Sequence, residues 1–372
     1  MAISHQINPF PVNKPVAPDE VIDRTPDIEK LVDLAIEGNN ARLVAPRRYG
    51  KTSLLRRVQE RLEMEGWTTV YVDLLGIVSA DDFSARIERA YTQQLTGKLA
   101  LWWAGVRRSL RPTVTAGGGP FPGSLSVDLS GPARDALLDR LDMPKKVFEK
   151  TGNRVYVAFD EFQELDQLVQ RNIDQVVRSV IQHHGDAASY VFAGSEIHMM
   201  EMMFADKERA FFGQALKTDL LPLDDQPLGE YIVSRFEEHG KSLDADVLEA
   251  LLGLVRGHPQ RAMVTAHALW NATDVVADVE NWEQARHDVM EEVDDELRTL
   301  WAATDTSQRE VLALLVAGKS ALSRAGGGAR GGSRVAAVEA LEAKGVIAKT
   351  PQDDDFIVDP LFVEWIRAQS SG

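Results

Sequence analysis

The fold of this chain is decided by the stretch Val44-Ala45-Pro46-Arg47-Arg48-Tyr49-Gly50-Lys51-Thr52-Ser53. A short apolar run, Ala41 to Val44, leads into it, and apolar residues at helical spacing follow it: Leu54, Leu55, Val58 and Leu62. This order predicts a strand, a loop and the first turns of a helix. Gly-Lys-Thr at such a junction is typical of the end of a phosphate-binding P-loop.

The residue types of this loop suit a nucleoside triphosphate. Backbone N–H groups at the start of a helix bind phosphates, and the helix dipole helps them. Lys51 would reach the β- and γ-phosphates, and the Thr52 hydroxyl would bind Mg²⁺. We therefore expect a nucleotide-binding loop, in which Lys51 is also catalytic, made of Pro46, Arg47, Arg48, Tyr49, Gly50, Lys51, Thr52 and Ser53.

One position departs from the usual P-loop pattern, because this chain has Ala45 where the pattern has glycine. Alanine fits only if the backbone there keeps a negative φ. The alternative interpretation of the stretch is a chance Gly-Lys-Thr on a surface turn.

A second run of residues supports the P-loop. Val155 to Phe159 is almost continuously apolar, as a buried parallel strand should be, and Asp160 and Glu161 follow it. Acids at the carboxyl end of a central strand lie where open α/β sheets bind ligands. Asp160 would hold Mg²⁺, and Glu161 would orient or deprotonate the attacking water. The alternative is an acidic surface turn after a core strand.

Composition bounds the class of protein. The chain has 372 residues, 44% of them hydrophobic, a net charge of −16 and no cysteine. The length predicts two or three domains, and the lack of cysteine excludes disulfides and cysteine metal sites. We expect a cytoplasmic protein without a membrane partner, because no segment has the length of a transmembrane helix and Met1 to Pro15 lacks the apolar core of a secretory signal. The acidic charge argues against broad coating of nucleic acid.

Strands alternate with helices through the first 225 residues. Besides the two strands already described, strands are predicted at 68–74, 189–195 and 216–221, and helices at 25–38, 81–95 and 165–183. This α/β order predicts a P-loop NTPase with a parallel sheet and helices on both faces. Residues 97–133 break the rhythm with a helix and a β-hairpin around a glycine- and proline-rich turn. That insertion is either a flap near the nucleotide or a partner, or a decorative edge hairpin.

The C-terminal part follows a different pattern. From Pro227 to Thr299 only helical periodicity remains, which predicts a small helical lid domain. A helix capped by Asp305 or Thr306, a second helix capped by Ser333 and two short strands then predict a winged helix-turn-helix. We expect three domains: a P-loop domain of residues 1–225, a helical lid of residues 226–300 and a winged-helix domain of residues 301–372. Residues 97–133 would form an insertion in the first domain.

Short motifs lie in order along the chain: Asn8-Pro9-Phe10, Val21-Ile22-Asp23-Arg24, Arg47 to Leu54, Phe159-Asp160-Glu161, Phe192-Ala193-Gly194-Ser195, Gly257-His258-Pro259 and Asp359-Pro360-Leu361-Phe362. In this combination they resemble the archaeal-type AAA+ ATPases. That P-loop family is related to the STAND signalling ATPases and, more distantly, to the ATPases that initiate replication at origins. The resemblance covers nearly the whole chain and implies ATP and Mg²⁺ as ligands.

The resemblance also implies roles for residues outside the P-loop. Ser195 matches the sensor-1 residue, which contacts the γ-phosphate or the attacking water. Pro259 lies in a loop that reaches the nucleotide from the lid, and Ile22 and Arg24 would lie near the adenine. Arg261 is either a sensor-2 arginine or a surface helix residue.

One departure from the family bears on the rate of hydrolysis. The family often has Gly-Arg after the sensor-1 helix, in a position suited to an arginine finger, where this chain has Gly213-Gln214. Glutamine lacks the positive charge, which contributes roughly 10³–10⁵ in rate where it has been measured. Arg209 or a neighbouring subunit could supply that charge; otherwise hydrolysis would be slow.

The charge of the expected winged helix bears on whether it binds DNA. Residues 304–372 contain eight Lys and Arg against nine Asp and Glu, and Asp353-Asp354-Asp355 place negative charge on the wing. Acidic residues repel the phosphate backbone, and residues 334–344 offer few side chains that read base edges. DNA binding is therefore possible but not favoured over packing against protein.

The first hypothesis is thus a regulatory ATPase of the AAA+/STAND type, in which Mg-ATP binding and hydrolysis rearrange the lid and the winged helix. Self-association or a protein partner is compatible with it. Two alternatives are open: a nucleotide-gated scaffold that does not hydrolyse ATP, and a DNA-binding ATPase similar to the initiators.

Overall fold

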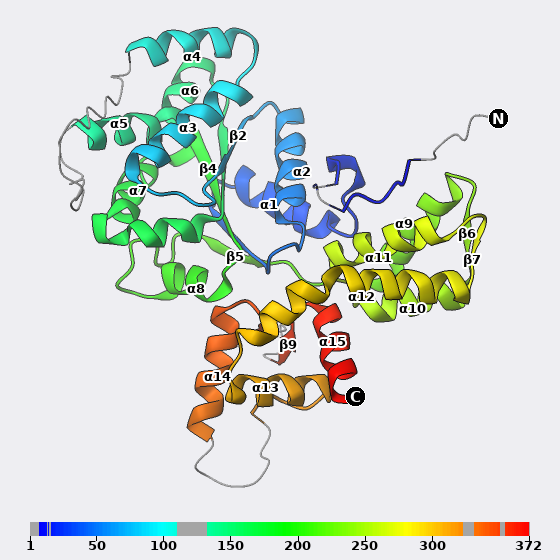
Figure 1. The fold of residues 1–372 in the computed structure, drawn as a ribbon. Helices are drawn as coiled ribbons and strands as arrows, with labels where there is room; N and C mark the ends of the chain where they lie inside the picture. Colours follow the sequence, from blue (N-terminus) through cyan, green and yellow to red (C-terminus); the bar gives the residue numbers. More distant parts are fainter. Residues whose placement is uncertain are drawn as a thin grey trace, which may run out of the picture. The chain divides into compact units, whose positions relative to one another are not determined.

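The computed structural model describes residues 7–12, 14, 16–109, 132–322, 331–349 and 354–371. The chain forms two compact units (Figure 1). We call the unit of residues 27–44 and 55–219 the sheet unit, and the unit of residues 1–26, 45–54 and 220–372 the helical unit.

The sheet unit is built on five parallel strands. In the order in which they are hydrogen-bonded, β2-β3-β4-β1-β5, these are Thr68–Asp73, Val155–Asp160, Ala188–Gly194, Ala41–Val44 and Leu216–Asp219. Every residue of β3 and β4 is buried, which explains why both strands are almost continuously apolar in sequence, with Asp160 and Ser189 as exceptions. All five strands lie where the sequence predicted them, within two residues at each end.

Helices lie on both faces of this sheet (Figure 1): α1 (Thr25–Ile36), α2 (Lys51–Met64), α3 (Ala80–Gln94), α4 (Gly97–Ser109), α5 (Pro132–Leu141), α6 (Met143–Thr151), α7 (Ile173–Ile181) and α8 (Ile197–Ala205). A 3₁₀ stretch, Phe162–Arg171, follows β3, and a shorter 3₁₀ turn lies at Gly185–Ala187. A third 3₁₀ turn, Pro18–Glu20, belongs to the helical unit. Aromatic rings dominate the core between strands and helices. Phe159 stacks on Phe192 with ring centroids 6.2 Å apart.

The helical unit contains the remaining elements: α9 (Asp225–Glu237), β6 (Ser242–Leu243), α10 (Ala245–Val255), α11 (Pro259–Ala272), β7 (Val276–Ala277), α12 (Val279–Ala302), α13 (Thr306–Val316), α14 (Gly331–Ala343), β8 (Ile347–Lys349), β9 (Asp355–Ile357) and α15 (Pro360–Ser371). β8 and β9 pair antiparallel after two helices, which is the expected winged helix-turn-helix order. Asp305 caps α13 through a capping box with Gln308, so that cap prediction is confirmed.

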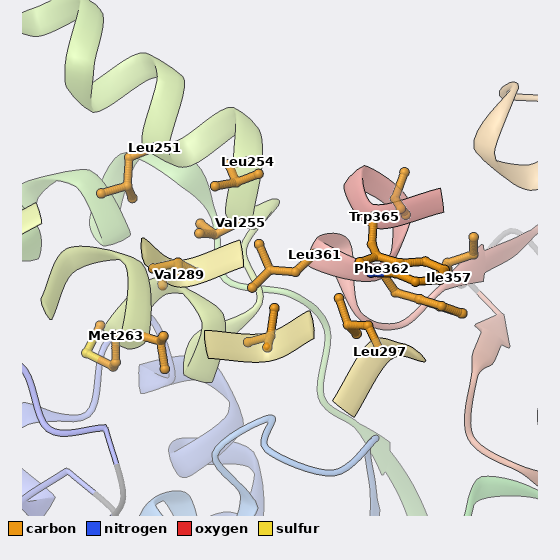
Figure 2. Close-up of a cluster of buried hydrophobic side chains, with 14 of the residues drawn as sticks. Leu251, Leu254, Val255, Met263, Val289, Leu297, Ile357, Leu361, Phe362 and Trp365 are labelled. Atoms are coloured by element: carbon orange, nitrogen blue, oxygen red, sulfur yellow. The ribbon is translucent and has the colours of Figure 1, made fainter. Parts of the chain in front are cut away.

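One continuous core holds the helical unit together. Figure 2 shows Leu251, Val255 and Val289 from the expected lid on one side, and Phe362 and Trp365 of α15 on the other. Leu361 lies between the two sets. Residues 226–300 and 301–372 therefore share one core, and α12 runs uninterrupted through residue 300. The three-domain division stays a prediction.

The structure corrects three sequence predictions. The helix expected at 165–183 is a 3₁₀ stretch followed by α7, because Asn172 between them has a left-handed φ of 52°. The region expected to be only helical contains the two-residue strands β6 and β7, which pair in parallel. Ser333 is not a helix cap, since α14 already begins at Gly331.

The helix expected at the start of the insertion is present as α4. The predicted hairpin after it, and Asp353 of the acidic wing, lie outside the described residues. None of the helices that the structure describes is both long and apolar enough to span a bilayer.

Candidate functional site

The P-loop segment leaves β1 at Val44 and ends where α2 begins at Lys51. Ala45 is buried and does not have a positive φ, so alanine fits where the usual pattern has glycine. The left-handed positions of the loop fall instead at Arg48, with φ 67°, and at Gly50, with φ 84°. Glycine adopts such a φ without the steric strain of a side chain, which accounts for Gly50 at the helix start.

The Lys51 ammonium lies over its own loop. Its Nζ donates to the carbonyl oxygens of Ala45 at 2.9 Å and Pro46 at 3.0 Å, and the side chain is 5% exposed. Arg47 is exposed, whereas Thr52 is half-buried. Lys51 is thus held at the N-terminus of α2, where backbone N–H groups and the helix dipole favour an anion.

Two residues of the loop contact the rest of the helical unit. Arg48 Nη1 lies 3.0 Å from a carboxylate oxygen of Glu296 on α12, and both side chains are about half exposed. The Tyr49 ring packs edge-on against His258, with centroids 4.9 Å apart. Burial raises the pKa of the Tyr49 hydroxyl, and the nearby Asp359 carboxylate adds to the effect.

Arg261 is buried, not a surface helix residue, with 2% of its surface exposed. Its Nε lies 3.1 and 3.0 Å from the two carboxylate oxygens of Asp359, at the start of α15. Its Nη2 also lies 3.4 Å from Glu296. Arg48, Glu296, Arg261 and Asp359 therefore form a continuous chain of alternating charges, which we call the charge chain.

The Gly257-His258-Pro259 loop places Arg261. Pro259 is the first residue of α11, and the buried His258 ring caps the helix by accepting from the Arg261 N–H at 3.3 Å. Gly257 has φ 71°, and a Cβ there would lie 2.2 Å from the Leu223 carbonyl oxygen, so only glycine fits. Burial lowers the pKa of His258 to about 4.

The segment expected near the adenine is fixed within the helical unit. Arg24 is buried and donates to the Leu221 carbonyl at 2.7 Å. The Asp23 carboxylate accepts from the Asp224 N–H at 2.8 Å. Ile22 is partly buried against the core of the same unit. This segment is thereby joined to the chain just before α9.

Polar residues gather at the carboxyl ends of β3 and β4 in the sheet unit: Asp160 and Glu161 at β3, and Ser195 at β4. Asp160, 3% exposed, accepts from the Tyr71 hydroxyl at 2.5 Å and from the Glu161 N–H at 3.0 Å. The Ser195 hydroxyl donates to Glu161 Oε2 at 2.6 Å. Glu161 and Ser195, assigned separately to water activation and sensing, are thus in direct contact.

Sequence reasoning missed Gln163, whose amide Nε2 also donates to Glu161 Oε2 at 2.6 Å. The sequence gives no distinct signal for Gln163, because Glu164 and Gln167 lie in the same stretch and are equally polar.

The register of the strands relates these residues to β1. Val44 of β1 is aligned with Gly194 of β4, and Phe159 of β3 with Phe192 of β4. The strands are parallel, so Val44, Asp160 and Ser195 lie at or directly after the carboxyl ends of strands on the same side of the sheet. That side is where open α/β sheets bind ligands.

The two residues considered in relation to an arginine finger have local partners. Arg209 forms an ion pair with Asp166, and the Gln214 amide donates to the Phe212 carbonyl at 3.1 Å.

Basic residues of α14 and the turn after it are likewise engaged within the helical unit. Arg334 lies 3.9 Å from Glu310, and Lys344 Nζ donates to the Ala303 carbonyl at 2.7 Å and the Gln308 amide oxygen at 3.0 Å. Because Arg334 and Lys344 are engaged by these groups, they are less available to bind the phosphates of a DNA backbone.

Comparison with solved structures identifies the fold. A Walker-type ATPase of Pyrococcus abyssi is similar with a TM-score of 0.68 and 16% identity, over 96% of this chain and 99% of that one. The ORC2 protein of Aeropyrum pernix is similar in its ADPNP–ADP complexes, with a TM-score of 0.56, 14% identity and coverage of 97% and 98%. Its ADP form gives a TM-score of 0.53, 14% identity and 97% coverage of both chains.

The sequence matches no protein-family model, and no curated protein is significantly similar to it. The chain therefore has the P-loop fold of the AAA+ ATPases, with a lid and a winged helix after the sheet, as its resemblance to the archaeal-type family predicted.

Proposed function

We propose that this chain is a regulatory AAA+/STAND-like ATPase, which couples Mg-ATP binding and hydrolysis to rearrangement of its lid and winged helix. The observation that carries the proposal is the 2.6 Å contact between Ser195 and Glu161 at the ends of β4 and β3. These strands belong to the sheet whose β1 leads directly into the Lys51 loop.

Catalysis of phosphoryl transfer depends on positioning the reacting groups and on stabilising the charge of the phosphates, and Glu161, Ser195 and Lys51 would each serve one of these purposes. Glu161 would accept a proton from the attacking water or orient it, with Ser195 beside the same carboxylate. Lys51 would neutralise the phosphates. Glu161 has a left-handed φ of 53°, which costs on the order of 1–2 kcal/mol for a side chain of this kind. Such strain is common where a side chain is held for function.

The predicted magnesium ligands have suitable chemistry. Mg²⁺ prefers oxygen donors, and Asp160 offers a carboxylate fixed by Tyr71, while Thr52 offers a hydroxyl in the first turn of α2. When bound, the ion neutralises charge that develops on the phosphates. Because Asp160 and Thr52 belong to different units, their joint role stays a prediction.

Adenine is the favoured base. The two ORC2 structures of similar fold contain ADP or ADPNP, and the family resemblance points the same way. Ile22, Arg24 and Pro259 stay the predicted contacts from the helical unit.

The charge chain supports coupling to the lid and the winged helix. It joins the P-loop, α12, α11 and the start of α15 through Arg48, Glu296, Arg261 and Asp359. A triphosphate would compete with the two carboxylates for the two guanidinium groups. A ligand that makes different contacts in two states shifts the balance between them.

The charge for an arginine finger would come from another subunit. Gln214 carries no charge, and the Arg209 guanidinium is paired with Asp166. We therefore expect slow turnover from the isolated chain and a faster specific rate where copies meet.

The test is steady-state hydrolysis of Mg-ATP by the purified chain, beside Glu161→Gln, over a range of protein concentrations. The substitution keeps the size of the side chain but removes the base, so we expect turnover to fall by about 10²-fold or more. Binding of Mg-ATP should persist in the variant. A specific rate that rises with protein concentration would support an arginine supplied in trans.

Two outcomes would change the conclusion. Tight Mg-ATP binding without turnover in the wild type would favour a nucleotide-gated scaffold. A shift of duplex DNA that weakens with salt would favour an initiator-like role, which the paired Arg334 and Lys344 argue against.

A further inference from the structure

Gln163 is a buried amide that contacts both Glu161 and Ser195. Its side chain is 1% exposed. Its Nε2 donates to Glu161 Oε2 at 2.6 Å and lies 3.5 Å from the Ser195 hydroxyl. An ionised carboxylate only accepts hydrogen bonds, so the amide must present its nitrogen to Glu161. One oxygen of Glu161 thus accepts from two donors that come from different elements.

The position of Gln163 is fixed by its neighbour in the chain. The preceding residue, Phe162, is fully buried, and its ring lies 4.6 Å from that of Phe192 and 5.1 Å from that of Phe211. Both residues open the 3₁₀ stretch that starts directly after Glu161. Because the aromatic cluster holds Phe162, the adjacent amide has little freedom to leave the carboxylate.

Packing of the amide demands glycine on the neighbouring strand. A Cβ on Gly194 would lie 2.6 Å from Gln163 Oε1 and 2.5 Å from Met200 Cγ. Both distances are too short for non-bonded atoms, so Gly194, one residue before Ser195, leaves the room that the amide occupies.

The arrangement is not explained by stability. Among the described residues, Gln163 Oε1 has no hydrogen-bond partner although it is buried. A buried acceptor without a partner destabilises the folded state, because it has lost its hydrogen bonds to water. An apolar side chain of the same size would fill this site without that cost, so the donor Nε2 is the property that the site requires.

We infer that Gln163 is a positioning residue: it holds the Glu161 carboxylate beside Ser195, in the orientation used on the attacking water. The inference rests on the proposed ATPase function and adds a residue to it. Gln163 acts through Glu161 and does not itself touch the nucleotide. Loss of its donor should therefore lower kcat and leave the KM for Mg-ATP unchanged.

The test compares hydrolysis kinetics of the full chain and of Gln163→Met, which keeps the length of the side chain and removes the donor. Misplacement of a catalytic group by about 1 Å costs on the order of 10²-fold, so we expect kcat to fall by about that factor. The matched control is Gln167→Met. Gln167 lies in the same 3₁₀ stretch and donates to Glu164 at 2.9 Å, and its loss should leave kcat near the wild-type value.

A second variant covers the case in which Gln163→Met fails to fold. Gln163→Glu keeps the shape but sets a carboxylate against Glu161, and we expect a comparable loss of kcat. In a double-mutant cycle, either change at Gln163 should have no further effect on kcat once Glu161 is Gln.

The outcomes separate this inference from the proposed function. Turnover that Glu161→Gln abolishes but Gln163→Met leaves unchanged would overturn the role of Gln163 alone. An equal loss of kcat in Gln163→Met and Gln167→Met, with lowered thermal stability in both, would reduce Gln163 to a structural residue. A wild type without turnover, at every protein concentration, would overturn both proposals together.

Discussion

The His258 imidazole is a buried base that should make the helical unit sensitive to acid. The residue is 4% exposed, and burial is the main reason why its pKa is lowered to about 4. The positive charges of Arg261 and Arg48 lower the pKa further, whereas the negative charge of Asp359 raises it. An unfolded chain takes up a proton near pH 6.5, whereas the folded unit resists protonation down to about pH 4. Stability is thus fully present above pH 6.5 and is lost as pH falls through that window.

We expect the free energy of unfolding of the wild type to fall by roughly 3 kcal/mol between pH 7 and pH 4 because of His258 alone. The figure follows from the difference between its pKa of 6.5 in the unfolded chain and about 4 in the folded one. His258→Asn is the control, since asparagine also caps helices but does not titrate. Denaturant unfolding at several pH values measures the difference. Parallel pH profiles of the two proteins would contradict the prediction.

Sequence reasoning placed residues in the fold where they belong to local motifs. Glu161 directly follows a predicted strand and Lys51 opens a predicted helix, so their positions followed from short patterns, and their roles stay predictions. Gln163 was missed because glutamine has no motif of its own and its role depends on burial. The Arg261 partner was missed for another reason: Asp359 is 98 positions away, and only the fold brings the two together.

Among the elements, α11, α12 and α15 meet at the charge chain, and this junction gives a test of coupling. Asp359→Asn removes the charge that holds Arg261. We expect Mg-ATP to bind about 5-fold tighter or more, because the guanidinium becomes available to phosphate. Stability should fall by about 2 kcal/mol, less than the roughly 3–5 kcal/mol of a fully buried pair, since a fifth of the Asp359 side chain is exposed.

Titration of the purified variant with Mg-ATP checks the affinity, and thermal unfolding checks the stability. Glu364→Gln is the matched control on α15, because Glu364 pairs with Arg367 and Arg256 but not with Arg261. Weaker binding in Asp359→Asn would mean that the ion pair places Arg261 for the nucleotide instead of withholding it.

Elements with strong local signals were predicted well, and those set by distant contacts were not. The Asp305 capping box and the apolar run of β3 were readable because each is complete within a few residues. The change from 3₁₀ stretch to α7 depends on the backbone of Asn172, which periodicity does not encode. Strands β6 and β7 have two residues each and exist only because the helices bring Ser242 next to Val276.

Over the helical unit as a whole, the lid and the winged helix should unfold together. Leu361 is fully buried between residues of both parts, so Leu361→Ala should cost about 2–5 kcal/mol. Hydrogen exchange should then show lost protection in α10 and α12 as well as in α13 and α15. Leu322→Ala is the control, because Leu322 is 55% exposed. Loss of protection confined to residues 304–371 would indicate that the winged helix is an independent domain.

The length of α12 sets how far a local event can reach. The helix has 24 residues without a break, or roughly 36 Å at 1.5 Å per residue. Near its C-terminal end it carries Glu296, within reach of Arg48 on the P-loop, and Asp294, which accepts from the Trp365 indole at 2.7 Å. A tilt of about 5° about that end would swing the opposite end by about 3 Å. A change in the contacts of Glu296 with the P-loop would therefore also be felt at the N-terminal end of α12, which directly follows β7.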